Sequence, residues 1–232
     1  MKRLFLLLTV PLIFGCAKPG VSKYEFIPSD INKVKHEIVL NQSFDETWDA
    51  LVENLTSSFY VINNIEKSSR IINVSFSSNE PEEFIECGES IRHYERGKES
   101  QDYRYKFSES TSYKIAGKTN ISSPMTTYID RETNLEGRIN IYVAPFKEKT
   151  KIKVNVRYIL TIQVQGHSAL EDKFGKVVKY ERIQPVSNTL SFSTNEDHNY
   201  NIGDSTNPIN VSCFSNGKLE SEILSFAKTE DE

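Results

Sequence analysis

The sequence predicts an α+β fold in which an antiparallel sheet packs against two helices, within a single domain that carries long loops. Apolar residues occupy every second position from Ile152 to Val164, with mostly polar residues between them. This period of two is typical of a strand with one buried face. Two segments with helical spacing, residues 43–56 and 219–226, lie near the start and the end of the same region. A sheet that buries its apolar face on two helices is a stable layer arrangement.

The segment after residue 43 is the best-marked helix. Ser43 is followed three residues later by Glu46, which is the spacing of a capping box. Apolar residues then recur at the spacing of one helical face, at Trp48, Leu51, Val52 and Leu55. A buried core position for Trp48 is favoured over contact with a ligand. The last helix repeats this pattern with Leu219, Ile223 and Phe226 after the Asn216-Gly217 turn.

Strands are predicted at residues 34–40, 59–65, 70–77, 139–143, 152–164, 189–193 and 209–213. Residues 59–77 form a hairpin around the polar turn 66–69. Residues 79–123 are polar and show no clear pattern, and residues 166–185 and 194–208 are expected to be insertions or long loops. Within the first of these, residues 92–106 interleave Arg, Lys and Tyr, which suggests nucleic-acid binding. Three acidic residues offset the positive charge there (Glu95, Glu99, Asp102), so a solvated hairpin is the favoured interpretation.

The first fifteen residues resemble a lipoprotein signal peptide. Lys2 and Arg3 precede an apolar run from Leu4 to Phe14, which is shorter than the roughly 20 residues of a membrane-spanning helix. The segment Ile13-Phe14-Gly15-Cys16 looks like a lipobox, although Phe14 is bulkier than the usual residue at its position. That resemblance implies cleavage before Cys16 and lipidation of its thiol. The alternative is an ordinary secreted protein with an unpaired cysteine.

The predicted organisation is therefore a signal peptide (residues 1–15), a lipidated tether (residues 16–33) and an α+β domain (residues 34–228). Acyl chains hold a protein stably on a membrane when two or more are attached. Ala17, rather than Asp, follows the cysteine, and by the usual sorting rule this implies transport to the outer membrane. The domain would then face the periplasm or the cell surface.

The two remaining cysteines, Cys87 and Cys213, are expected to form a disulfide, because an exported chain folds in an oxidising compartment. Two buried free thiols are the alternative. The chain has 28 basic and 32 acidic residues and a net charge of −4. Since neutralising phosphates requires an excess of basic residues, this composition argues against nucleic acid as a partner.

The order of elements resembles the helix-grip domains of bacterial envelope lipoproteins, such as the C component of the β-barrel assembly machinery (BamC). The matching parts are the "SFDETWDAL" helix with Phe44, Trp48 and Leu51, the hairpin through Ile62, Ile72 and Phe76, and the closing "CFSNGKLESEIL" segment. The resemblance implies a helix-grip-like fold and a place in the bacterial envelope. The resemblance covers about a third of the chain. The predicted disulfide is not part of the BamC pattern, and the second domain of BamC has no counterpart in the predicted organisation.

The sequence carries no motif of catalysis. The four histidines (His36, His93, His167, His198) are scattered, and none has the spacing of a zinc ligand. Residues 197–203 begin like a calcium loop, but Gly203 comes one place late and Pro208 stands where the bidentate glutamate belongs. We therefore predict no catalytic residue, no metal ligand and no cofactor.

Together these features predict a non-enzymatic lipoprotein of the outer membrane, a structural or assembly component that binds other envelope proteins. One alternative is a helix-grip module that binds a lipid or a small apolar ligand between helix and sheet. The other is an enzyme, which would need a pocket with converging carboxylates or a His–Asp pair.

Overall fold

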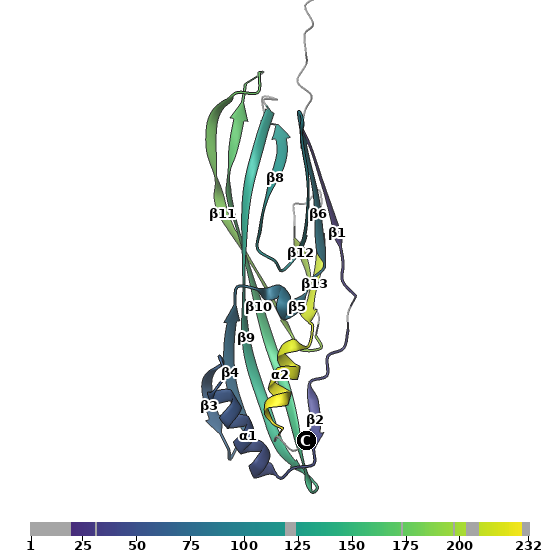
Figure 1. Cartoon of the computed structure of the whole chain (residues 1–232), viewed down its shortest axis with the longest axis vertical. Coiled ribbons are helices and arrows are strands. Elements are labelled where there is room, and N and C mark those ends of the chain that lie inside the picture. Colours follow the sequence, from purple (N-terminus) through teal and green to yellow (C-terminus); the bar gives the residue numbers. More distant parts are fainter. Residues whose placement is uncertain are drawn as a thin grey trace, which may run out of the picture.

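The computed structural model describes residues 20–30, 32–118, 124–172, 174–196, 198–202 and 209–228. Strands make up 65% of the structure and helices 13%. The predicted α+β fold, one antiparallel sheet packed on two helices, is therefore wrong: the protein is mostly β. The helices cover only one end of the largest sheet, and two further sheets account for much of the rest (Figure 1).

Two strands of 23 residues each, β9 (Pro124–Phe146) and β10 (Lys149–Glu171), run the length of the molecule. They pair antiparallel from Lys149↔Phe146 to Leu170↔Met125 and are joined by a tight turn at Lys147 and Glu148. At about 3.3 Å per residue, each strand spans roughly 75 Å. This long hairpin gives the elongated shape seen in Figure 1, and the other elements lie at different positions along its length.

Near the β9–β10 turn, three strands extend the hairpin into a five-stranded sheet. β2 (Glu37–Leu40) pairs with β10, β4 (Ile71–Ser78) pairs with β9, and β3 (Val61–Glu66) pairs with β4. The helices α1 (Phe44–Thr56) and α2 (Lys218–Phe226) cover the apolar face of this sheet. Their side chains join those of β4, β9 and β10 in one hydrophobic core.

At the other end, the hairpin is one layer of a sandwich. β8 (Thr111–Lys118) pairs with β9, and β11 (Val177–Ser193) pairs with β10. The second layer is the sheet β1–β6–β7, formed by Val21–Ile27, Glu89–Arg96 and Glu99–Lys106. A small hydrophobic cluster, Tyr105, Tyr113 and Ile129, lies between the layers.

A third sheet connects the two ends. It contains β12 (His198–Ile202), β13 (Ile209–Ser215) and the two-residue strand β5 (Ile85–Glu86), which follows the short 3₁₀ helix η1 (Pro81–Glu83). β13 leads directly into α2, so this sheet positions the last helix against the core.

Several segments predicted as loops are strands. Residues 166–185 contain the end of β10 and the start of β11. Residues 79–123, which show no clear pattern in the sequence, contain β5 to β8. Within residues 194–208, the structure shows β12, and residues 197 and 203–208 lie outside its description. The tether predicted for residues 16–33 is also wrong for Val21–Ile27, which form β1 on β6. These strands carry many polar side chains because much of their surface faces water, so they lack a clear apolar alternation.

The elements closest to the core are where the sequence places them. The α1 capping box is present: the Ser43 hydroxyl accepts from the Glu46 backbone N–H at 3.3 Å, and the Glu46 carboxylate accepts from the Ser43 N–H at 2.9 Å. Trp48 is only 4% exposed and belongs to the core. Residues 92–106 lie in a hairpin, β6–β7, as predicted. Only one face of it is solvated, because Tyr94 and Tyr105 are buried against the other layer. Among the described residues, no helix is long and apolar enough to cross a bilayer.

Candidate functional site

Cys87 and Cys213 form a disulfide, as predicted, with an S–S distance of 2.02 Å. Cys87 follows β5, Cys213 lies in β13, and both side chains are buried. The bond therefore fixes β13, and through it α2, to the segment that enters the sandwich. Cys16 and the predicted signal peptide lie outside the described residues, so their roles stay predictions.

The three histidines whose side chains the structure describes do not come together. His36 lies beside Asn195, with 2.7 Å between Nδ1 and the amide nitrogen, and His93 contacts Asp102 at 2.7 Å on the exposed β6–β7 hairpin. His167 stacks on Tyr128 at the far end of β10. Across the described ranges, His, Cys, Asp and Glu side chains form no group of three that could hold a metal ion. Asp197, Gly203 and Pro208 of the calcium-like segment lie outside the described residues.

One carboxylate, that of Glu220 in α2, is fully buried. It accepts hydrogen bonds from the hydroxyls of Tyr158 (3.1 Å), Thr194 (2.7 Å) and Ser215 (2.8 Å). These donors come from β10, the end of β11 and the end of β13, so the network ties α2 to three strands. Burial, and then the Glu220 charge, raise the pKa of Tyr158 well above its usual range. The network is closed to solvent, which is typical of a structural role.

We expect Glu220→Ala to lower the free energy of unfolding by about 3 kcal/mol, because it leaves three buried hydroxyls without their acceptor at about 1 kcal/mol or more each. Urea unfolding followed by circular dichroism measures the change. Ser221→Ala, at the exposed neighbouring position of the same helix, is the control and should change stability by less than about 0.5 kcal/mol. Equal midpoints for Glu220→Ala and the wild type would show that the network contributes nothing.

Two arginines lie among aromatic rings inside the sandwich. The Arg92 guanidinium lies between the rings of Tyr24 (4.2 Å) and Tyr113 (4.3 Å), and its Nε donates to the Tyr105 hydroxyl at 2.8 Å. Arg131 is buried beside Tyr105 and Phe107. Its guanidinium donates to the backbone carbonyls of Phe107 and Glu109. These contacts join the two layers of the sandwich by cation–π interactions and hydrogen bonds.

Burial is also the main cause that raises the pKa of Tyr24, Tyr60 and Tyr113. In the unfolded chain these tyrosines and Tyr158 ionise near the ordinary value of 10.0. Above that pH the unfolded state loses protons that the folded state keeps, so unfolding becomes more favourable. Below it, both states are protonated and these groups cause no pH dependence.

We therefore expect the free energy of unfolding to fall as the pH rises above about 10, with no contribution from these tyrosines at lower pH. Urea midpoints measured across this range test the expectation. In Tyr158→Phe, which removes one such group, the alkaline decrease should be smaller. Tyr180→Phe, at an exposed position, should show the wild-type decrease. An identical slope in all three proteins would contradict the assignment.

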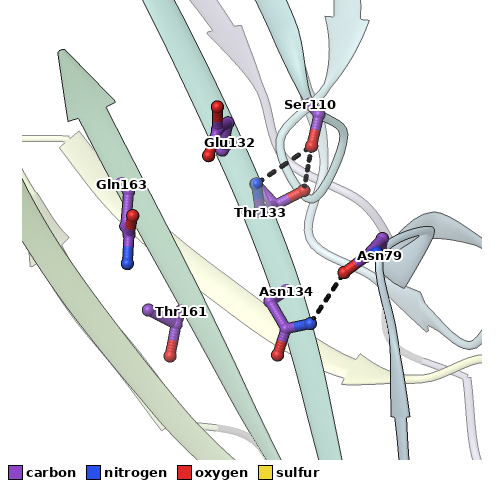
Figure 2. A pocket seen from close by; sticks show the side chains of 7 residues that line it. All are labelled: Asn79, Ser110, Glu132, Thr133, Asn134, Thr161 and Gln163. Atoms are coloured by element: carbon purple, nitrogen blue, oxygen red, sulfur yellow. Dashed lines mark hydrogen bonds between the residues drawn. The ribbon is translucent and has the colours of Figure 1, made fainter.

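One candidate site is a polar groove on the face of the long hairpin (Figure 2). It forms at the stretch of β9 between two partner strands on the same edge. β4 pairs with β9 only as far as Leu135, and β8 begins to pair with it at Arg131. Its cavity volume is about 350 Å³, and it is lined by Asn79, Ser110, Glu132, Thr133, Asn134, Thr161 and Gln163.

Side chains occupy part of the gap left between β4 and β8. The Ser110 hydroxyl accepts from the Thr133 backbone N–H at 2.9 Å, and the Asn134 amide donates to Asn79 Oδ1 at 3.0 Å (Figure 2). Glu132 and Gln163 are exposed, directly opposite each other on β9 and β10. Glu132 is the one ionisable residue among those lining the groove. A single carboxylate with amides and hydroxyls suits hydrogen bonding to a polar partner better than acid–base catalysis, which needs a second converging group.

The groove could not be found by sequence reasoning, because Asn79 and Ser110 lie in a polar region without a clear pattern and the strand over residues 132–134 was not expected. A search of protein-family models, of curated proteins and of solved structures found no match to this chain.

Proposed function

We propose that the protein is a non-enzymatic lipoprotein of the bacterial envelope, anchored to the outer membrane by acyl chains on Cys16. In this proposal the folded part binds other envelope proteins as a structural or assembly component. The observation that carries it is the disulfide between Cys87 and Cys213. Such bonds form and persist outside the cytoplasm, in compartments such as the periplasm.

The disulfide also limits the role of the third cysteine. The chain has three cysteines, so Cys16 is the one left outside the bond, directly after a short apolar run with basic residues at its start. A lipid acceptor explains both its position and its exclusion from the disulfide. The polar groove supports a binding role, since its lining offers donors and acceptors to a partner.

The alternative of an apolar-ligand module has less support. The apolar side chains of α1 and α2 pack with those of the sheet in one core, with Trp48, Leu51, Leu219 and Ile223 all buried. The groove on the long hairpin is lined by polar side chains. We therefore keep the binding of envelope proteins as the proposal.

A photo-crosslinking residue at Gln163, in the groove, tests the binding role in intact cells. Asn155 is exposed on the same face of β10, eight residues away and outside the groove, and provides the matched control. We expect a crosslinked envelope protein with the probe at Gln163 and a much weaker product at Asn155. No partner above background at either position would count against the proposed function.

A further inference from the structure

At the end of the β10–β11 hairpin, the β11 strand is exposed on both faces. From Val177 to Arg182, successive residues of β11 point to opposite sides, and all six are exposed. Phe174, in the turn, is 83% exposed, and Val178 is 63% exposed. A sheet in water normally buries one face, and clustered exposed apolar side chains mark contact surfaces. This end of the hairpin therefore has the composition of a surface that contacts an apolar phase.

Aromatic residues lie just below this apolar end. The rings of Tyr128, His167 and Tyr180 form a row across β9, β10 and β11, with centroid distances of 4.9 Å and 5.8 Å. Tyr180 is 66% exposed and lies two residues, or about 7 Å, along the strand from Val178. An apolar tip followed by a row of tyrosines is the pattern found where proteins enter the interface of a bilayer.

The charges nearby suit lipid headgroups. Lys179 pairs with Glu181 at 2.6 Å, and Glu171 pairs with Arg96 at 2.9 Å. The Asp172 carboxylate accepts from the backbone N–H groups of Phe174 and Lys176, so it fixes the turn. Lys176 and Arg182 form no ion pair with any residue that the structure describes. Basic residues beside an apolar tip favour a surface with anionic lipids.

The first described residues of the chain, from Gly20 onward, lie at the same end of the molecule. The Ser22 hydroxyl accepts from the Ala116 N–H at 2.6 Å, and Ala116 is level with Tyr180 through the pairs Ala116↔Thr126, Thr126↔Ala169 and Ala169↔Tyr180. Figure 1 shows β1 and β11 reaching the end opposite α1. Cys16 is four residues before Gly20, a reach of at most about 14 Å.

We propose that the end of the β10–β11 hairpin, residues 174–180, inserts into the interfacial region of the bilayer that holds Cys16. This inference rests on the lipid anchor of the proposed function. With Cys16 and the end of the β10–β11 hairpin both in contact with lipid, the rest of the molecule extends away from the membrane. The polar groove and the helical end are then accessible to partners. The depth that the tip reaches, about 5–10 Å, is that of interfacial segments in general.

Tryptophan fluorescence tests the insertion. The chain has one tryptophan, Trp48, which is buried in α1 at the opposite end. The full lipidated chain with Phe174→Trp is reconstituted into vesicles of phosphatidylcholine and phosphatidylglycerol with brominated acyl chains, and the wild-type signal is subtracted. Phe146→Trp is the matched control, because Phe146 is 48% exposed beside the turn at the other end of β9–β10.

We expect brominated lipid to quench most of the added emission of the Phe174→Trp variant and to leave that of the Phe146→Trp variant unchanged. Equal emission from Phe174→Trp in brominated and ordinary vesicles, with the protein still floating with the vesicles, would overturn the hairpin insertion and leave the anchor intact. If the full chain failed to float and behaved like Cys16→Ser, both the insertion and the proposed anchor would be wrong.

Discussion

Replacing Cys87 and Cys213 together by alanine is expected to lower the free energy of unfolding by about 5 kcal/mol, the value of the chain-entropy model for so long a loop. The cysteines are 126 residues apart, so the bond removes a large part of the freedom of the unfolded chain. The two side chains are also buried, at the point where β13 meets the core. Urea unfolding of the oxidised wild type and the double variant measures the difference.

Reduction of the wild type provides the control for this prediction, because it breaks the bond without changing any side-chain volume. The reduced protein should unfold close to the midpoint of the double variant. If oxidised and reduced wild type shared one midpoint, the disulfide would have no stabilising role, and its use as evidence for an oxidising compartment would be weakened.

The second large effect is expected for Trp48→Ala, which should cost about 3–5 kcal/mol, as for other large aromatic side chains removed from a core. Trp48 is 4% exposed and packs beside Phe44, with 5.7 Å between ring centroids. Its loss leaves a cavity between α1 and the sheet. The measurement is again urea unfolding, combined with far-ultraviolet circular dichroism to show whether the variant still folds.

Phe59 gives a matched comparison, since it is aromatic, lies just after the same helix and is 58% exposed. Phe59→Ala should change stability by less than about 0.5 kcal/mol, as is usual for exposed positions. A similar cost for both variants would mean that Trp48 contributes no more than a surface residue, contrary to its place in the core.

The elements around the core could be predicted from the sequence because each has one apolar face, which the fold buries. In α1, the capping box and the apolar face at Trp48 and Leu51 agree with each other. In β10, the alternation from Ile152 to Val164 reflects one buried face throughout. The disulfide could also be predicted, because an exported chain leaves few other roles for two cysteines.

The rest of the fold escaped prediction for a physical reason. In β9 the buried face carries Thr127, Arg131 and Thr133 as well as apolar residues. The polar groups on this face form hydrogen bonds, so the apolar alternation is interrupted. The sandwich interior is built from tyrosines and arginines that resemble a solvated surface in sequence. At the end of β11 neither face is covered, so no alternation exists there to be detected.

The candidate groove shows a further limit. Its residues come from four separate segments: Asn79 follows β4, Ser110 precedes β8, and the others lie on β9 and β10. Sequence spacing carries information about neighbours along one helix or strand, whereas this groove depends on where two partners of β9 end. Only the register of the sheet brings these residues together.

The most direct test of the lipid anchor is metabolic labelling with a fatty-acid analogue in cells that produce either the wild type or Cys16→Ser. We expect label on the wild-type chain, in the membrane fraction, and none on the serine variant. A mature wild-type chain without label, or one that keeps its first fifteen residues, would contradict the anchor and, with it, the assignment of the protein to the outer membrane.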